Sequence, residues 1–133
     1  MLDDLFNAAR AAQAKAYAPY SKFSVGAAIR TASGKIYAGC NVENAAYPQG
    51  ACAETGAISA MIVGGEHEIA EILVIGDGAG LVTPCGGCRQ RIREFAAPGT
   101  AIHIAGPSGV RAHFTLEELL PVSFGPDHLG MKS

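Results

Sequence analysis

The sequence predicts an α/β fold, a three-layer sandwich in which a mixed sheet of about five strands carries helices on both faces. Two observations predict this class. Apolar residues recur at helical spacing in some segments and form short strand-like runs in others, and these segments alternate along the chain. Their order is helix, strand, strand, helix, strand, helix, strand, strand and short helix, which implies a mixed sheet. The 133 residues contain no internal repeat or low-complexity linker, so we expect one domain over residues 1–133.

The first half of the chain begins with an amphipathic helix over residues 2–17. Two acids occupy its first turn, and it ends before Pro19. The elements that follow are a strand over 23–31, a turn at 32–34, a strand over 35–42 that pairs back as a hairpin, a loop over 43–50 and an apolar helix from Cys52 to about Val63.

The second half continues with a buried type of strand over 71–76, which the apolar run Ile-Leu-Val-Ile indicates. Thr115 and Glu118 have the spacing of a capping box at the start of a short helix, and the tail from Val122 is expected to be irregular. The other elements are a loop over 77–83, a helix from Cys85 to near Pro98 and strands over 101–105 and 110–114.

Cys85 and Cys88 form the most specific local motif, Pro-Cys-Gly-Gly-Cys, at the start of a predicted helix. Residues three apart lie on one helix face, so both sulfurs can point at the same place. The helix dipole at that end favours thiolate over thiol. The motif therefore predicts half of a metal site.

Cys52 and Glu54 supply the other half at the start of the preceding helix. A ligand, one spacer and Glu, followed later by Pro-Cys-x-x-Cys, is the pattern of zinc deaminases. Both helices follow strands or strand-linked loops, so their N-termini can converge at one sheet edge, where α/β folds place ligands. Three cysteines would leave a fourth zinc position for water, as in catalytic sites.

Other interpretations of these residues remain open at this point. Cys-x-x-Cys alone is also typical of thioredoxin-like redox pairs. A structural zinc would need a fourth protein ligand, for which Cys40 is the candidate, although at the end of an apolar strand it is expected to be a small buried residue. Glu54 could be a dipole partner in the first helical turn. The four histidines show no ligand spacing and are expected at the surface or satisfied in the core.

Four segments resemble the cytidine deaminases, and together they span nearly the whole chain. They are residues 17–31 (Tyr-Ala-Pro-Tyr-Ser-Lys-Phe onwards), 41–54 (Asn-Val-Glu-Asn to Cys-Ala-Glu), 83–90 (Thr-Pro-Cys-Gly-Gly-Cys-Arg-Gln) and 119–126 (Leu-Leu-Pro-Val-Ser-Phe-Gly-Pro). The resemblance is to the small homotetrameric class. It implies hydrolytic deamination of cytidine and 2′-deoxycytidine in pyrimidine salvage.

The resemblance also implies roles for individual residues. One zinc per subunit would be held by Cys52, Cys85 and Cys88, and Glu54 would act in turn as base and acid. The implied substrate contacts are Asn41 and Glu43 at the ribose hydroxyls, Phe23 in the pyrimidine pocket, the Ala53 backbone N–H and the Thr83 carbonyl at the base edge, and Tyr47 and Phe124 in a neighbouring subunit's pocket.

Thr55 departs from the pattern of this class. Many members whose three ligands are cysteines carry arginine directly after the glutamate, where it offsets thiolate charge. Here that position is threonine, and Arg89 and Arg91 are the nearby cations that could substitute.

The composition indicates which partners the protein is expected to bind. Charged residues make up 17% of the chain against about 25% in a typical domain, which suggests surface buried between copies. The helix from Cys52 is apolar on several sides, so we expect it to contact both its own sheet and a partner, with Met61 at the partner contact. A net charge of −2 gives no footprint for nucleic acid.

No apolar run predicts a membrane span or a signal peptide. Four cysteines then favour metal ligands in a reducing cytoplasm over disulfides. The alternatives left open are a blasticidin-type or other aminopyrimidine nucleoside deaminase, a deaminase of bases or polynucleotides, and a zinc-stabilised module without turnover.

Overall fold

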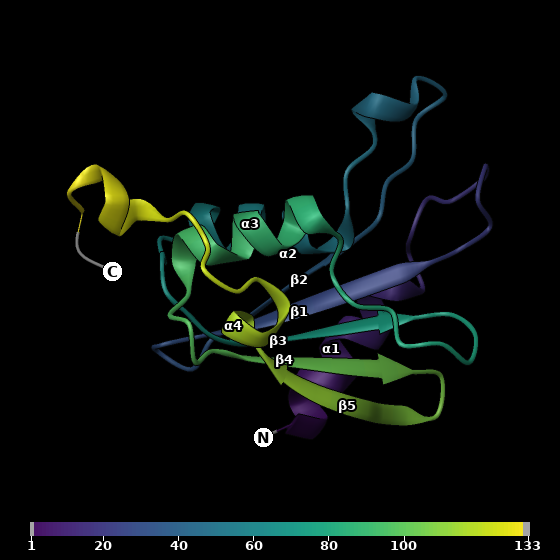
Figure 1. Cartoon of the computed structure of the whole chain (residues 1–133). Helices are drawn as coiled ribbons and strands as arrows, with labels where there is room; N and C mark the ends of the chain where they lie inside the picture. The colour runs from purple at the N-terminus through teal and green to yellow at the C-terminus, as the bar shows by residue number, and fades with distance from the viewer. Residues whose placement is uncertain (1, 132–133) are drawn as a thin grey trace.

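A five-stranded mixed sheet organises the structure, a computed structural model that describes residues 2–131 (Figure 1). The strand order is β2-β1-β3-β4-β5, in which β3 and β4 are parallel and every other neighbouring pair is antiparallel. The elements are α1 (Leu2–Gln13), β1 (Val25–Thr31), β2 (Ile36–Cys40), η1 (Tyr47–Gln49), α2 (Ala53–Val63), β3 (Ile69–Gly76), α3 (Gly86–Phe95), β4 (Ala101–Gly106), β5 (Gly109–Thr115), α4 (Leu116–Leu119) and η2 (Pro126–Leu129).

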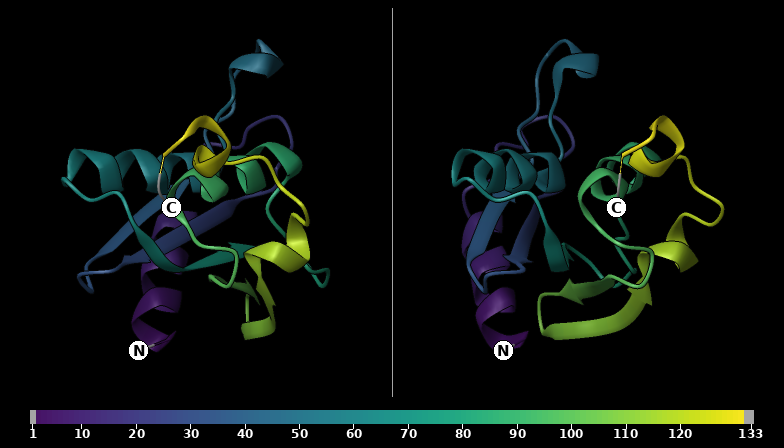
Figure 2. Two further views of the ribbon diagram at one scale, coloured as in Figure 1. Left: turned by 60° about the vertical axis from the view of Figure 1, so that its left-hand side comes forward. Right: turned by 90° about the vertical axis from the view of Figure 1, so that its left-hand side faces the viewer.

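Helices cover both faces of this sheet, as the sequence predicted (Figures 1 and 2). Residues of the central strands alternate between two apolar clusters because successive side chains of a strand point to opposite faces. Ala28, Leu73 and Ile75 pack with α1, whereas Ile29, Ile72 and Val74 pack with α2 and α3. α2 and α3 thus lie side by side on one face, and the elements that carry the cysteines are neighbours.

Two glycines allow the helices to approach the sheet closely. A Cβ atom at Gly39 of β2 would lie 2.4 Å from the backbone nitrogen of Ala57 in α2, and one at Gly26 of β1 would lie 2.1 Å from the Ala9 carbonyl of α1. Backbone atoms cannot yield to such contacts as a flexible side chain could. Gly39 therefore sets how closely α2 packs on the sheet. Cys52 is the N-cap of this helix, and Glu54 lies in its first turn.

Some predicted boundaries were wrong. α1 ends at Gln13 rather than at residue 17, because the backbone of Tyr17 leaves the helix to pair with Asn41 and Val42. The tail was expected to be irregular, but η2 forms a short 3₁₀ helix there. The capping box of Thr115 and Glu118 is confirmed, with both hydrogen bonds present.

The expected position of Met61 was also wrong. Its side chain is fully buried in the cluster between α2 and the sheet, because Met61 lies one helical turn beyond Ala57 on the same stripe. The exposed apolar residues of α2 are instead Ile62 and Val63, which are 38% and 89% exposed. Within residues 2–131, no helix has the length and apolar character needed to span a bilayer.

Candidate active site

Cys52 and Cys85 both stand at the N-cap position of a helix. Cys52 precedes α2 and Cys85 precedes α3, and each has an extended backbone, with ψ of 158° and 168°. Neither sulfur makes a capping hydrogen bond to its own helix, so both are available to a ligand. Cys88 follows in the first turn of α3 and is completely buried. The positive ends of two helices therefore point at one place, which favours negative charge there.

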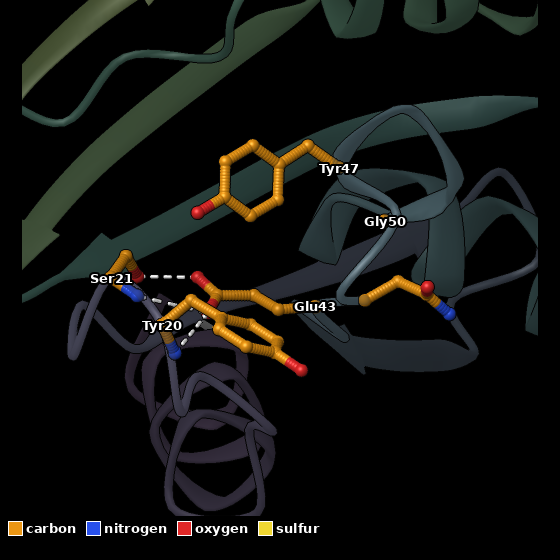
Figure 3. Close-up of a pocket in the computed structure, with 6 residues that line it drawn as sticks. Tyr20, Ser21, Glu43, Tyr47 and Gly50 are labelled. Carbon is orange, nitrogen blue, oxygen red and sulfur yellow. Dashed lines mark hydrogen bonds between the residues drawn. The ribbon is translucent and has the colours of Figure 1, made fainter.

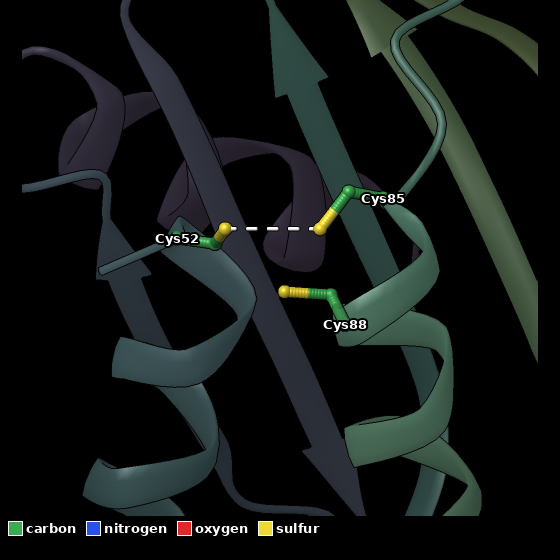
Figure 4. A group of neighbouring side chains, drawn as sticks. All are labelled: Cys52, Cys85 and Cys88. Carbon is green, nitrogen blue, oxygen red and sulfur yellow. Dashed lines mark hydrogen bonds between the residues drawn. The ribbon is translucent and has the colours of Figure 1, made fainter. Parts of the chain in front are cut away.

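The three sulfurs meet between the two helix ends (Figure 4). All three Sγ atoms lie within 4.8 Å of one another, and the Sγ atoms of Cys52 and Cys85 are 3.9 Å apart. Thiolates about 2.3 Å from a tetrahedral zinc would lie about 3.8 Å apart. The cluster therefore fits Zn²⁺ in both ligand type and spacing, and it contains three sulfurs where a redox pair has two.

Cys40 does not belong to this cluster of described residues. It ends β2 and is half-buried, so it is less enclosed than the sequence suggested. A fourth protein ligand from Cys40, which a structural zinc would need, is therefore absent within residues 2–131.

Burial and hydrogen bonding together set the acidity of the three thiols. It raises the pKa of Cys88 to about 12 and also raises the pKa of Cys52. Cys85 is the most exposed of the three: burial alone would raise its pKa, but hydrogen bonds with Cys88 and Cys52 lower it. Binding a metal to all three sulfurs must therefore release protons from Cys52 and Cys88.

Glu54 lies in the first turn of α2, two residues after Cys52. The residue is only 4% exposed, although it carries a carboxyl group. Burial raises the pKa of this carboxyl, while its own backbone N–H and the nearby Arg91 guanidinium act in the opposite direction. A carboxyl group with a raised pKa in a buried site is suited to both accepting and donating a proton.

Polar side chains from both helices contact the sulfur of Cys88. The Oγ1 of Thr55 lies 3.8 Å from it, and Nη1 of Arg91 donates to it at 3.7 Å. Arg89 points elsewhere, because it donates to the carbonyls of Pro84 and Leu119 and to Oγ1 of Thr83. The sequence predicted that either arginine could offset the thiolate charge. Arg89 and Arg91 lie one and three residues after Cys88, on different faces of α3, and the structure places Arg91 at the sulfur.

Asn41 and Phe23 lie together at the ends of β2 and β1. The Asn41 side chain donates through Nδ2 to the Phe23 carbonyl and accepts at Oδ1 from the Val25 N–H, at 2.9 Å each. Phe23 is 38% exposed and is therefore not the core aromatic that its residue type alone would suggest. The amide of Asn41 fixes the backbone on both sides of Ser24.

Glu43 lines a pocket of about 370 Å³ with Tyr20, Ser21, Asn44, Tyr47 and Gly50 (Figure 3). Its carboxylate accepts from the backbone N–H groups of Tyr20 and Ser21 and from the Ser21 hydroxyl. Hydrogen bonds from Ser21 lower the pKa of Glu43, so the group is charged at neutral pH. The three clustered cysteines do not line this pocket, which is bounded on one side by the 77% exposed Tyr47.

Phe124 lies in the C-terminal tail, held against α3. Its backbone carbonyl accepts from Nε2 of Gln90, and its ring stacks on His128 with centroids 5.1 Å apart. The ring is 57% exposed and does not contribute to the pocket of Glu43. The structure of one chain thus brings Glu54 to the cysteines, and Glu43 to Tyr47, while Phe124 stays apart.

Local sequence patterns did not identify the residues that support these groups. No individual role was predicted for Tyr20 and Ser21, which bind Glu43, or for Arg93, which holds the tail through Ser123 and Asp127. Their partners lie 22 or more residues away, which local spacing cannot reveal. The histidine prediction holds for His103, a buried residue whose ring nitrogens contact Glu71 and His113.

Comparison with known proteins agrees with this geometry. Residues 2–104 match the family described as the cytidine and deoxycytidylate deaminase zinc-binding region. The chain is 38% identical over 128 residues to a cytidine deaminase of Sporosarcina psychrophila, covering 96% of this chain and 94% of that protein. It is 43% identical over 124 residues to one of Mycobacterium tuberculosis, covering 92% and 88%.

The fold is shared as well. The crystal structure of cytidine deaminase from Burkholderia pseudomallei superposes with a TM-score of 0.86 at 41% identity, covering 93% of this chain and 99% of that one. The family match spans both helix starts, and each of these relatives matches more than nine-tenths of this chain. The chain therefore belongs to the cytidine and deoxycytidylate deaminase family.

Proposed function

We propose that this protein is a zinc-dependent hydrolase that deaminates cytidine and 2′-deoxycytidine to uridine and 2′-deoxyuridine in pyrimidine salvage. Water adds to the ring carbon that bears the amino group, the bond from that carbon to the amino nitrogen breaks, and ammonia leaves. The observation that carries the proposal is the placement of the buried Glu54 beside three cysteine sulfurs at two converging helix ends.

Cys52, Cys85 and Cys88 are the proposed ligands of one zinc per subunit, and their donor set and spacing support this role. Zinc, when bound, would activate a water molecule for attack on the pyrimidine ring. Three protein ligands are typical of a catalytic zinc, which keeps one position open.

Glu54 is the proposed proton carrier. It accepts one proton of the attacking water and passes it to the ring nitrogen. It then accepts the second proton, from the hydroxyl that has added to the ring carbon, and delivers it to the departing amine. A single carboxyl can serve these transfers in turn only if both of its protonation states are accessible during turnover. Its burial, which disfavours the charged form, supports this double role.

The remaining contacts are proposed to position the nucleoside. Asn41 and Glu43 would bind the ribose hydroxyls, and Asn41 retains one N–H and one lone pair beyond the bonds it makes. Phe23 would flank the pyrimidine. The Ala53 backbone N–H and the Thr83 carbonyl, which belong to segments that also carry zinc ligands, would bind the base edge.

Assembly completes the proposal. We propose a homotetramer in the cytoplasm in which Tyr47 and Phe124 enter a neighbouring subunit's pocket, since both rings are exposed in the single chain. The proposed substrate is a free nucleoside, with neither nucleic acid nor membrane as a partner. The charged Glu43 at the sugar site would repel a 3′-phosphate.

Loss of absorbance on mixing the zinc-loaded protein with each substrate tests this function. Cytidine and 2′-deoxycytidine are expected to react, while cytosine reacts poorly because the binding energy of the sugar is missing. Parallel assays with deoxycytidine 5′-monophosphate, blasticidin S and a cytosine-containing oligonucleotide separate the other deaminases. Efficient turnover of the oligonucleotide would contradict the sugar assignment, and a zinc-loaded protein that turns over none of these would be a structural module.

A further inference from the structure

The proposed zinc site has more negative charge than its metal can neutralise. Three thiolates around a dication leave a net charge of −1, and the carboxyl of Glu54 lies in the same buried region. The positive ends of α2 and α3 offset part of this charge. A buried charge without a counter-charge is strongly unfavourable, so the site needs a cation close to a sulfur.

Arg91 occupies the position that such a cation requires. It lies three residues after Cys88 on α3, so both side chains share one helix face. Its Nη1 donates to the Cys88 sulfur at 3.7 Å, and that sulfur belongs to the completely buried member of the cluster. Gly87 leaves room for the guanidinium, because a Cβ atom there would lie 3.1 Å from the same Nη1.

Arg89 cannot take this role in the observed arrangement. Its Nε, Nη1 and Nη2 atoms all donate to oxygen atoms, at 2.7, 2.8 and 3.0 Å. Those bonds tie the segment before α3 to the end of α4. Among the arginines and lysines of residues 2–131, Arg91 is the one that donates to a sulfur of the cluster.

Thr55 approaches the same sulfur from α2. Its Oγ1 lies 3.8 Å from the Cys88 Sγ, and a hydroxyl can donate to a thiolate. A longer, cationic side chain at position 55 would begin beside the same sulfur. Positions 55 and 91 are therefore two alternative places on two helices from which one positive charge can reach Cys88.

We propose that Arg91 neutralises the Cys88 thiolate and thereby sets the zinc affinity of the site, with Thr55 as a neutral second donor. Arg91 is a positioning residue, because it acts on a zinc ligand and not on the substrate. The inference rests on the proposed ligand set of Cys52, Cys85 and Cys88. It assigns the compensating positive charge to α3, because α2 contains no basic residue.

Competition for zinc with the chromophoric chelator 4-(2-pyridylazo)resorcinol measures the effect on the full-length protein. Loss of a side chain that supports a metal ligand typically weakens metal binding by roughly 10- to 100-fold, and we expect this for Arg91→Met. Arg91→Lys keeps the charge and should recover part of the affinity. Adding Thr55→Arg to Arg91→Met should restore most of it, a rescue that a merely misfolded protein could not show.

Arg10→Met is the matched control, since Arg10 is an exposed arginine of α1 on the opposite face of the sheet, and its zinc affinity should equal that of the wild type. Far-ultraviolet circular dichroism checks that each variant is folded. Zinc binding that is lost in Cys88→Ser but unchanged in Arg91→Met would overturn the inference alone. Zinc binding that is unchanged in Cys88→Ser would overturn the ligand set and this inference together.

Discussion

At the scale of single residues, the site depends on one carboxyl group held where water is scarce. Glu54 is almost fully buried and lies two residues from a sulfur, in the first turn of α2. The helix dipole there stabilises the charged form, and burial stabilises the neutral form. A carboxyl balanced between these influences can change its protonation state during a reaction, which a surface glutamate at neutral pH would not do.

Replacing Glu54 with glutamine tests this role directly. The amide keeps the size of the side chain and removes the titratable proton. General acid–base catalysis by one group contributes about 10²–10⁴-fold, and here one residue serves several transfers. We expect Glu54→Gln to lose at least about 10³-fold in kcat with cytidine while it binds zinc with unchanged stoichiometry. Near-normal kcat in the zinc-loaded variant would disprove the proton-carrier role, and metal analysis of the same sample guards against simple metal loss.

The residues of the cluster could be predicted from the sequence because their spacing is local. Cys85 and Cys88 are three apart at a helix start, and Cys52 and Glu54 are two apart at another. The groups that orient such residues come from far along the chain. Ser21 reaches Glu43 over 22 positions, and Arg93 reaches Asp127 over 34. Sheet pairing and helix packing create those contacts, and no short motif records them.

At the scale of elements, α3 connects the site to the C-terminal tail. Gln90 donates to the Phe124 carbonyl, and Arg93 donates to Oγ of Ser123 and to a carboxylate oxygen of Asp127 at 2.8 Å each. Arg93 is only 7% exposed, so its guanidinium depends on these partners. The helix that starts at two cysteines therefore also fixes the backbone that presents the Phe124 ring.

Arg93→Met should release the tail. The apolar side chain retains much of the volume and removes both hydrogen bonds. We expect amide hydrogen exchange in residues 122–128 to accelerate roughly 30-fold, the factor that corresponds to two lost hydrogen bonds of about 1 kcal/mol each, while β3 and β4 keep their protection. Glu94→Gln, a change of an exposed neighbour on the same helix, is the control. Unchanged exchange in the tail of Arg93→Met would show that other contacts hold it.

The Asp127 end of this contact predicts the pH dependence of the same exchange. The hydrogen bond from Arg93 holds the pKa of Asp127 below its ordinary value. A carboxyl with a lowered folded-state pKa stabilises the fold at pH values above the unfolded pKa of about 3.9. The contribution of Asp127 to tail protection should therefore be constant from pH 7 to pH 5 and decline only as the pH falls through the folded pKa, and Asp127→Asn should remove that decline.

The elements themselves were largely predictable, and the misses have a common cause. Apolar patterning located the five strands and the helices α1, α2 and α3, since one face of each must be buried, and a capping box located α4. The 3₁₀ turn η1 lies in the segment over 43–50 that was predicted to be a loop. The predicted helix over 2–17 was too long because pairing of Tyr17 with the segment after β2 overrides helix propensity. The helical turn η2 was missed because it forms on contacts within the tail, where the Gly125 N–H before the turn donates to Nδ1 of His128 inside it.

At the scale of the whole molecule, the single chain leaves large apolar side chains in water. Val63 is 89% exposed, Tyr47 is 77% exposed and Phe124 is 57% exposed. Tyr47 begins η1, and the segment that carries η1 projects beyond the sheet (Figures 1 and 2). The Tyr47 ring contacts the Tyr20 ring edge-on at a centroid distance of 6.2 Å. It forms one wall of the pocket of Glu43, but most of its surface is exposed to water. Exposed apolar side chains that gather in this way are typical of a surface that packs against another chain.

The final prediction concerns that assembly. One side of α2 is buried against its own sheet, and the exposed Ile62 and Val63 belong to its other side. If copies of the chain pack through that side, a charge there should oppose association, because an interface core does not accommodate an unpaired charge. We expect the wild type to be a tetramer of about four 13.6 kDa chains, and Val63→Glu to shift light-scattering mass downward and to lower turnover of cytidine with it. Met61→Glu is the contrasting variant: Met61 is fully buried within one chain, so that change should lower the thermal midpoint of the fold itself. A wild-type monomer with full activity would refute both the shared pocket and the role of α2 as a contact surface.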